Sequence, residues 1–272
     1  MDANLQLRVQ RYGWDKAEPF YEKGWKKSLK PAQDLLLDMA KLKSGEKVLD
    51  ISCGTGIVSF QAAKIIGPTG EIIGTDISDK MIETAIKNTD GFPINNISFM
   101  RMEAEKLDFH NNRFDLALNA LGLMYYPDPE IALKEMHRVL VPGGRGISAV
   151  WGSRNNCGWS EIFPIVDSRV NTEVCPLFFL LGTGETLAQI YRQAGFSNVE
   201  SKTINTLLYY SSDKDALNAV FAGGPVAMAY SRFDQATKLS AHEDYLNSIQ
   251  PFKKDGEYFI PGEFVVVSGS KA

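Results

Sequence analysis

Cysteine and histidine are both scarce in this chain, which contains three of each. Cys53, Cys157 and Cys175 stand far apart and form no CxxC pair, which argues against a zinc site and against a disulfide framework. We therefore expect no metal and a reducing compartment. Cys53 has no obvious histidine near it in the sequence, so its interpretation as a small buried residue is preferred to that as a nucleophile.

An excess of basic residues is also absent. Lys and Arg total 29 against 33 Asp and Glu, a formal net charge of -4. Because sequence-independent binding to nucleic acid depends on cationic side chains, this balance disfavours a nucleic-acid partner. The longest apolar run, at 174–182, is too short to cross a bilayer, and the N-terminal segment lacks the apolar core of a signal peptide. We expect a cytoplasmic protein without a membrane span, monomeric or homodimeric.

Strand and helix patterns alternate through the first half of the chain. Apolar segments typical of strands lie at 47–52, 71–78, 97–102, 113–120 and 141–152. Amphipathic helical patterns lie between several of them. Because parallel neighbours need crossover connections, the alternation predicts a doubly wound α/β fold with a mostly parallel, seven-stranded, Rossmann-like sheet and helices on both faces.

The remaining segments are expected to build on this core as one continuous domain. Residues 1–44 predict a helical lid rich in aromatic side chains, with a helix that opens at Pro31. Residues 45–151 form the ligand-binding core. Residues 152–272 supply the rest of the sheet, with an insert before the last strand that we expect to build a substrate pocket.

The segment VLDISCGTG at 48–56 ends a predicted strand in glycines, where open parallel sheets bind ligands. A dinucleotide fingerprint needs a third glycine, but Ser59 stands at that position. Asp50 would repel a pyrophosphate and attract an ammonium group. Asp76, at the end of the second strand, can accept both hydroxyls of a ribose. A ligand with a nucleoside at one end and an ammonium group at the other is S-adenosylmethionine.

Five motifs in order resemble those of class I S-adenosylmethionine-dependent methyltransferases, specifically the small-molecule branch that includes the ubiquinone and menaquinone biosynthesis enzymes. They are VLDISCGTG, IIGTDIS, MEAEKLDF, FDLALNALGLMYYPD and VLVPGGRGISAVWG. The resemblance covers about residues 45–151. It implies an EC 2.1.1 type enzyme that moves a methyl group to a small organic acceptor by in-line displacement, with S-adenosylhomocysteine as product.

The resemblance also implies roles for individual residues. Asp50 and the loop glycines would surround the methionine part of the cofactor, Asp76 would bind ribose, and Asn119 would hold the methionine end. Glu103 stands where family members more often have Asp near the adenine amino group. The expected cofactor-binding residues are Asp50, Ser52, Gly54, Gly56, Asp76, Ile77, Met81, Glu103, Ala104 and Asn119.

The acceptor is expected among aromatic side chains at the carboxyl edge of the sheet, because ligand pockets are mostly apolar. The expected substrate residues are Tyr21, Trp25, Tyr125 and Phe179. Tyr126 is the candidate catalytic residue, since a phenol or hydroxyl acceptor would gain from a general base; His110 is a weaker candidate. Packing of Phe179 in the core is the alternative to a place in the pocket.

Two other functions stay open on the sequence alone. A nicotinamide-dependent oxidoreductase has a related sheet, although the missing third glycine argues against it. A non-catalytic module that binds S-adenosylmethionine is compatible with every cofactor motif. The sequence names neither the acceptor nor the O, N, S or C atom that is methylated.

Overall fold

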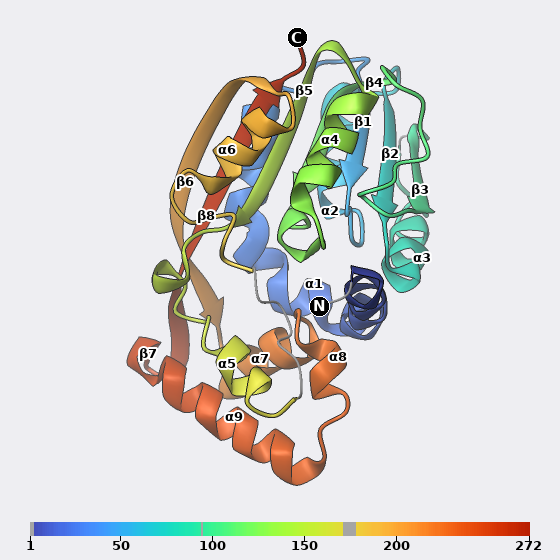
Figure 1. Cartoon of the computed structure of the whole chain (residues 1–272). Helices are drawn as coiled ribbons and strands as arrows, with labels where there is room; N and C mark the ends of the chain where they lie inside the picture. The colour runs from blue at the N-terminus through green and yellow to red at the C-terminus, as the bar shows by residue number, and fades with distance from the viewer. Residues whose placement is uncertain (1–2, 94, 171–177) are drawn as a thin grey trace.

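The structure is a computed structural model that describes residues 3–93, 95–170 and 178–272. Within these residues, eight strands form one sheet with the order β3-β2-β1-β4-β5-β8-β6, and β7 pairs with β8 at one end (Figure 1). The strands are β1 (Lys47–Ile51), β2 (Glu71–Asp76), β3 (Ile97–Arg101), β4 (Phe114–Ala120), β5 (Leu140–Trp151), β6 (Ser197–Tyr210), β7 (Lys253–Lys254) and β8 (Glu257–Ser270).

Parallel pairing joins the first five strands, while β8 runs antiparallel to both β5 and β6. The helices are α1 (Ala3–Ala40), α2 (Ile57–Ile66), α3 (Asp79–Lys87), α4 (Pro129–Val139), α5 (Ile162–Asp167), α6 (Thr186–Gln193), α7 (Asp213–Leu217), α8 (Ala227–Tyr230) and α9 (Gln235–Ile249). In Figure 1, α4 and α6 lie in front of the sheet and α1 passes behind it. The predicted doubly wound, mostly parallel sheet is confirmed, with the two-residue β7 as an addition.

The central strands are apolar because both faces of the sheet are covered. Val48, Leu49 and Leu118 are fully buried, and β1 and β2 are buried over nearly their whole lengths. Continuous rather than alternating apolar strands are the expected pattern when helices pack on both sides. Asp50 and Asp76 interrupt this pattern at or near the strand ends, and so place charge where the sheet meets the ligand-binding edge.

Helix α1 is a single 38-residue helix that contains Pro19 and Pro31. The expectation of a helix that begins at Pro31 is therefore wrong. A proline inside a helix removes one hydrogen bond and costs about 3 kcal/mol. Burial of Leu29 and Leu36 against the sheet offsets that cost, because each fully buried aliphatic side chain contributes about 1.5–3 kcal/mol.

The two ends of α1 have different neighbours. Helix α1 contacts β4, β5, β6 and β8, and Arg11 and Glu18 in its N-terminal half bond to Asp79 and Thr84 of α3. Helices α5, α7, α8 and α9 gather at the end of the long β6–β8 ribbon (Figure 1). The helical stretch expected near 213–249 is present as α7, α8 and α9.

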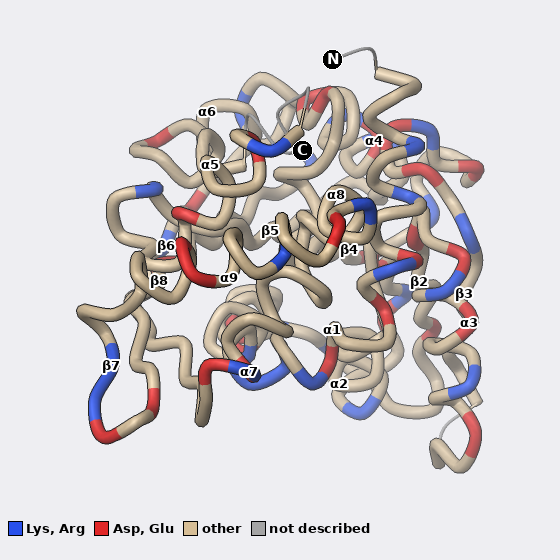
Figure 2. The backbone as a smooth tube through the Cα atoms, turned by 90° about the horizontal axis from the view of Figure 1, so that it is seen from below, with Lys and Arg blue, Asp and Glu red and all other residues tan. Residues whose placement is uncertain are grey.

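Lys and Arg positions are interspersed with Asp and Glu positions along the backbone of the outer helices and loops (Figure 2), in keeping with the nearly balanced composition. Of the helices in the described part of the chain, none combines the length and the apolar character that crossing a membrane requires.

Candidate active site

A cavity of about 80 Å³ lies at the carboxyl ends of β1, β2 and β4, beneath the N-terminal half of α1. The loops after the three strands and one face of α1 form its walls. This edge is where open parallel sheets bind ligands, because the strand order reverses there.

The loop after β1 runs through three residues with left-handed backbone: Ser52 (φ 57°), Gly54 (φ 55°) and Gly56 (φ 86°). Gly54 lines the cavity, and its amide donates a hydrogen bond to Asp76 Oδ2 at 2.9 Å. Gly56 instead begins α2 outside the cavity lining. A Cβ there would lie 2.8 Å from Phe60 Cε2, so packing alone requires a glycine.

Asp76 ends β2 and lines the cavity with its carboxylate. Its Oδ1 accepts a hydrogen bond from the Ser78 amide at 2.9 Å, while its Oδ2 accepts the Gly54 amide. Burial raises the pKa of Asp76 to about 6, against the lowering effect of these amides. Each carboxylate oxygen can accept a second hydrogen bond, so Asp76 can still bind two ligand hydroxyls.

Asp50 lies deeper, beside a smaller cavity of about 10 Å³ that shares Tyr21, Ser52 and Ala120 with the main one. The Ser59 hydroxyl donates to its Oδ2, but its Oδ1 is buried and has no hydrogen-bond partner among the described residues. Burial, assisted by the negative charge of Asp76, raises the pKa of Asp50 to about 7. A buried carboxylate oxygen without a donor is expected to attract a cationic group of a ligand.

Asn119 is fully buried, whereas Tyr126 lines the main cavity, and the two side chains belong to one hydrogen-bond network. Asn119 Nδ2 donates to Ile51 O at 3.1 Å and to Tyr126 Oη at 2.6 Å. Its Oδ1 accepts from the Leu123 amide at 2.8 Å, so the side chain is fully engaged within the protein. Tyr126 Oη lies 2.6 Å from Ser52 Oγ, and burial raises the pKa of Tyr126. At neutral pH the Tyr126 phenol is therefore protonated and is a poor general base.

The outer wall of the main cavity combines predicted and unpredicted residues. Ile77, Met81 and Ala104 line it as the sequence predicted, and Met102 and Glu105 join them. Glu103 lies outside the lining, in an isolated bridge with Lys106. Glu103 and Glu105 are two residues apart in one short segment, so the sequence alone did not show which of the two lines the cavity. Burial raises the pKa of Glu105, whose carboxylate accepts the Asp128 amide.

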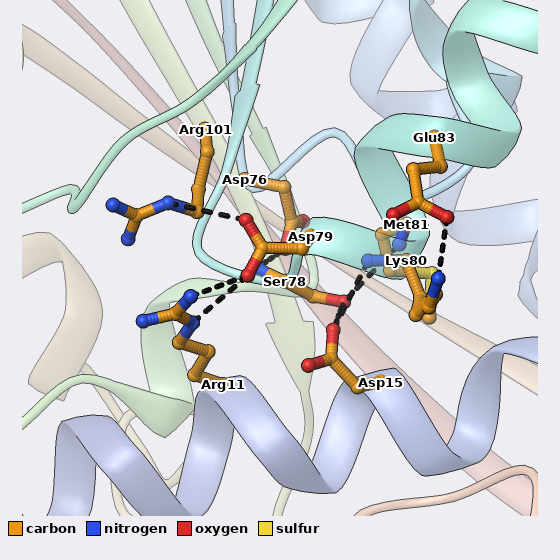
Figure 3. A network of polar contacts seen from close by, with 9 residues as sticks. All are labelled: Arg11, Asp15, Asp76, Ser78, Asp79, Lys80, Met81, Glu83 and Arg101. Atoms are coloured by element: carbon orange, nitrogen blue, oxygen red, sulfur yellow. Dashed lines mark hydrogen bonds and ion pairs between the residues drawn. The ribbon is translucent and has the colours of Figure 1, made fainter.

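Helix α1 covers the cavity with Leu7, Gln10, Trp14 and Tyr21. A polar network fastens this part of the helix to the N-terminus of α3 (Figure 3). Asp15 Oδ1 accepts hydrogen bonds from Ser78 Oγ at 2.6 Å and from the Lys80 amide at 3.1 Å. Arg11 pairs with Asp79. The covering helix is thus attached directly beside Asp76 through the loop that follows β2.

A second cavity of about 30 Å³ adjoins the first. Trp14, Tyr21, Leu121 and Tyr125 line both cavities. Of the other predicted substrate residues, Trp25 lines only the second cavity. Phe179 lines neither and packs against Trp159, Phe163 and Phe178, which is the core placement considered as the alternative. Residues 171–177 of the expected insert lie outside the described residues.

Comparison with known proteins places the chain in a family. A family model for a methyltransferase domain matches residues 42–161. A demethylmenaquinone methyltransferase of Staphylococcus saprophyticus is 31% identical over 176 residues, which are 60% of this chain and 75% of the relative. The chain belongs to the class I S-adenosylmethionine-dependent methyltransferases. Membership of this methyltransferase family sets aside the nicotinamide-dependent alternative.

Other relatives of this methyltransferase match a shorter region. The demethylmenaquinone methyltransferase of Staphylococcus carnosus is 40% identical over 107 residues, which are 39% of this chain and 44% of the relative. The chain thus spans less than half the length of that relative. The solved structure of Haemonchus contortus phosphoethanolamine N-methyltransferase 2 with S-adenosyl-L-methionine has a TM-score of 0.61 at 18% identity, covering 94% of this chain and 57% of that one. At this identity the likeness concerns the fold.

Proposed function

We propose that this protein transfers the methyl group of S-adenosylmethionine, bound in the main cavity, to a small, uncharged and mostly apolar acceptor bound in the second cavity. The observation that carries the proposal is the contrast between two adjoining cavities. Asp76 and Glu105 line the first, whereas the second is lined by aromatic and aliphatic side chains and Pro225. Shared walls at Trp14, Tyr21 and Tyr125 would bring the two ligands together.

The cofactor fits the chemistry of the main cavity in three parts. Asp76 would accept the ribose hydroxyls. Ile77, Met81 and Met102 supply apolar surface for the adenine ring. The methionine end would lie over Ser52 and Gly54, where its ammonium group would satisfy Asp50, whose Oδ1 has no partner among the described residues. Desolvation strengthens such a charged pair, because the surroundings of Asp50 are fully buried.

The acceptor class follows from the second cavity. Its lining contains no Lys, Arg, His, Asp or Glu among the described residues, so a charged acceptor would lose its hydration without gaining a partner. The Staphylococcus relatives are demethylmenaquinone methyltransferases, and an aromatic cavity suits a ring compound of that general kind. The acceptor nucleophile would enter from the wall shared by the two cavities.

Methyl transfer mainly requires the acceptor nucleophile to be aligned with the methyl group. Bound S-adenosylmethionine supplies a methyl group already activated by its sulfonium, so displacement forms one bond to the methyl carbon while the carbon–sulfur bond breaks and its electron pair returns to sulfur. The aromatic walls would orient the acceptor for this in-line approach, and orientation can contribute about 7–11 kcal/mol. Helix α1 would exclude water. Since burial raises the pKa of Tyr21 and Tyr126, both phenols stay protonated and do not serve as a general base.

A binding and a transfer experiment test the proposal together. S-adenosylhomocysteine should bind in calorimetry, and label from methyl-tritiated S-adenosylmethionine should move to an organic-soluble product when neutral ring compounds are supplied in an extract. Asp76→Ala should reduce both signals. Tight binding without transfer to any fraction of the extract would favour a non-catalytic binding module. Failure of S-adenosylhomocysteine to bind would contradict the proposal itself.

A further inference from the structure

The outward side of α1 carries a continuous line of exposed side chains. From Leu5 to Lys30 they recur at steps of three or four residues, which is the spacing of one face of a helix. We call this line the α1 stripe. It consists of three apolar side chains, Leu5, Tyr12 and Phe20, and five cations, Arg8, Lys16, Lys23, Lys27 and Lys30. At 1.5 Å per residue, the stripe is about 38 Å long.

Acidic side chains are absent from this exposed side of the helix. Among the exposed residues at 3–30, six are Lys or Arg and none is Asp or Glu. The acids of this segment have partners elsewhere. Asp15 accepts a hydrogen bond from Ser78 and points toward the N-terminus of α3 (Figure 3). Glu18 accepts one from Thr84, and Glu22 forms an ion pair within α1. The stripe is therefore a local positive surface on a chain whose formal net charge is -4.

Three cations of the stripe are available to an outside partner. Arg8, Lys16 and Lys27 form no ion pair with any described residue. Lys23 is partly engaged, because it lies close enough to Asp215 to interact through charge. Lys30 forms an exposed ion pair within α1. Because the available cations lie along one helix face, they would meet a flat anionic surface together.

The apolar members of the stripe stand in solvent between the cations. Leu5, Tyr12 and Phe20 are 39%, 46% and 44% exposed. A single exposed apolar side chain is ordinary. Here each of the three is followed by a cation one helical turn further along the chain. Aromatic rings mixed with Lys and Arg suit the interfacial layer of a membrane, where apolar and anionic groups lie within a few ångströms of one another. A nucleic acid backbone supplies the anionic groups but no apolar layer.

The opposite side of the same helix covers the main cavity. Gln10, Trp14 and Tyr21 line that cavity, whereas no member of the α1 stripe does. Docking through the stripe would leave these lining residues in place. The two sides of α1 can therefore be tested separately.

We propose that the α1 stripe docks this protein on the surface of a bilayer that contains anionic lipids. The cations lie at the lipid phosphates, and Tyr12 and Phe20 enter the layer between the headgroups and the acyl chains. The helix lies on the membrane, since none of the helices in the described ranges could cross one. The inference does not depend on the proposed function, because it concerns only the outer side of α1.

Co-sedimentation of the full chain with vesicles tests the inference. The protein should bind vesicles of phosphatidylcholine mixed with phosphatidylglycerol, should not bind pure phosphatidylcholine, and should be released as the salt concentration rises. Each cation near an anionic surface strengthens binding about fivefold. The triple variant Arg8→Gln, Lys16→Gln, Lys27→Gln should therefore bind more than about tenfold less tightly.

The matched control removes the same charge from three other elements. Lys87→Gln, Lys202→Gln and Lys254→Gln together neutralise exposed cations of α3, β6 and β7. This variant should bind within about twofold of the wild type, because charges far from the docked face are screened. Calorimetry with S-adenosylhomocysteine shows whether each variant is folded, and it reports separately on the proposed function.

A double variant, Tyr12→Ser with Phe20→Ser, distinguishes a membrane from other polyanions. It should weaken binding to the vesicles and leave the charge of the protein unchanged. Absence of wild-type binding to anionic vesicles at low salt, or an equal loss in both triple variants, would overturn the inference. So would binding to duplex DNA but not to vesicles. If the triple variant fails to fold, Lys16→Gln alone should lower vesicle binding about fivefold, and unchanged binding there would equally contradict the proposal.

Discussion

Asp50 and Asp76 are two buried carboxyl groups near the ends of neighbouring parallel strands. Burial raises both pKa values, to about 7 for Asp50 and about 6 for Asp76. A buried acid that must ionise to bind a cation destabilises the empty protein, and the ligand removes that cost. The same two residues therefore link folding, pH and cofactor binding.

Replacement of Asp76 tests its role toward the ribose. Asp76→Ala should weaken binding of S-adenosylmethionine by about 1.5–3 kcal/mol, the contribution typical of hydrogen bonds to a charged group. Calorimetry on the folded variant measures this loss. Asp90→Ala, which removes an exposed carboxylate beyond α3, should leave the affinity unchanged. Unchanged affinity in Asp76→Ala would show that Asp76 does not bind the ribose.

The pH dependence of stability tests the burial of Asp50. Because its pKa in the folded protein lies above the ordinary value of 3.8, the folded state retains a proton that the unfolded chain has lost between about pH 4 and 7. Stability therefore falls as pH rises through this window, by up to about 1.4 kcal/mol per pH unit for this group. Denaturant unfolding from pH 5 to 6.5 should show a smaller fall in Asp50→Asn than in the wild type. If the free energy of unfolding fell equally with pH in both proteins, the raised pKa of Asp50 would be contradicted.

At the residue scale, the sequence indicates candidate site residues best where a carboxylate ends an apolar strand. Asp50 and Asp76 stand out because apolar strands rarely end in carboxylates. The predicted role of Asn119 at the methionine end stays a prediction; in the structure its side-chain amide forms hydrogen bonds with Ile51, Leu123 and Tyr126. Hydrogen-bond partners across the fold decide such cases, and they are not local in sequence.

Helix α1 combines two tasks within one element. Its N-terminal half covers the main cavity, whereas its C-terminal half is part of the core. The sequence placed a helix start at Pro31, because proline favours the first turn of a helix. The tertiary contacts of Leu29 and Leu36 override that local preference. Local signals thus predicted the existence of the helix but not its length.

The attachment of α1 to α3 should control how fast the cofactor leaves. Asp15→Ala removes the acceptor of the Ser78 hydroxyl and the Lys80 amide, so the covering half of α1 should open more often. We expect the dissociation rate of S-adenosylhomocysteine, measured by stopped-flow fluorescence, to rise about five- to tenfold, as the loss of one to two hydrogen bonds predicts.

Glu22→Ala is the matched control on the same helix, because the ion pair of Glu22 in the described part of the chain lies within α1, with Lys26. Its dissociation rate should equal that of the wild type. If both variants released the ligand at the wild-type rate, α1 would not limit exit from the cavity.

At the scale of the whole molecule, ligand binding should stabilise the fold as a unit, since the main cavity is walled by α1 and by three strand ends. S-adenosylhomocysteine at about one hundred times its dissociation constant should add about 2.7 kcal/mol. This corresponds to a rise of roughly 5–10 °C in Tm for a chain of this size. Scanning calorimetry measures it, and Asp76→Ala should show a smaller rise at the same ligand concentration. An unchanged Tm in the wild type would show that the cavity does not bind the ligand.

The position of β8 between β5 and β6 has a consequence for how the protein is made. Ser148 in β5 pairs with Val267 in β8, far along the chain. In the described sheet, β5 therefore has β4 on one side but lacks its second neighbour, and β6 lacks its partner strand, until β8 has been synthesised. Pairings between distant segments form slowly, because the intervening chain must first be ordered. We expect β1 to β5 to assemble early and β8 to insert last, as a closing step after the folding barrier. In stopped-flow refolding, Val267→Ala should then speed unfolding with little change in the refolding rate, whereas Leu118→Ala in β4 should slow refolding. The reverse pattern would place β8 in the folding nucleus.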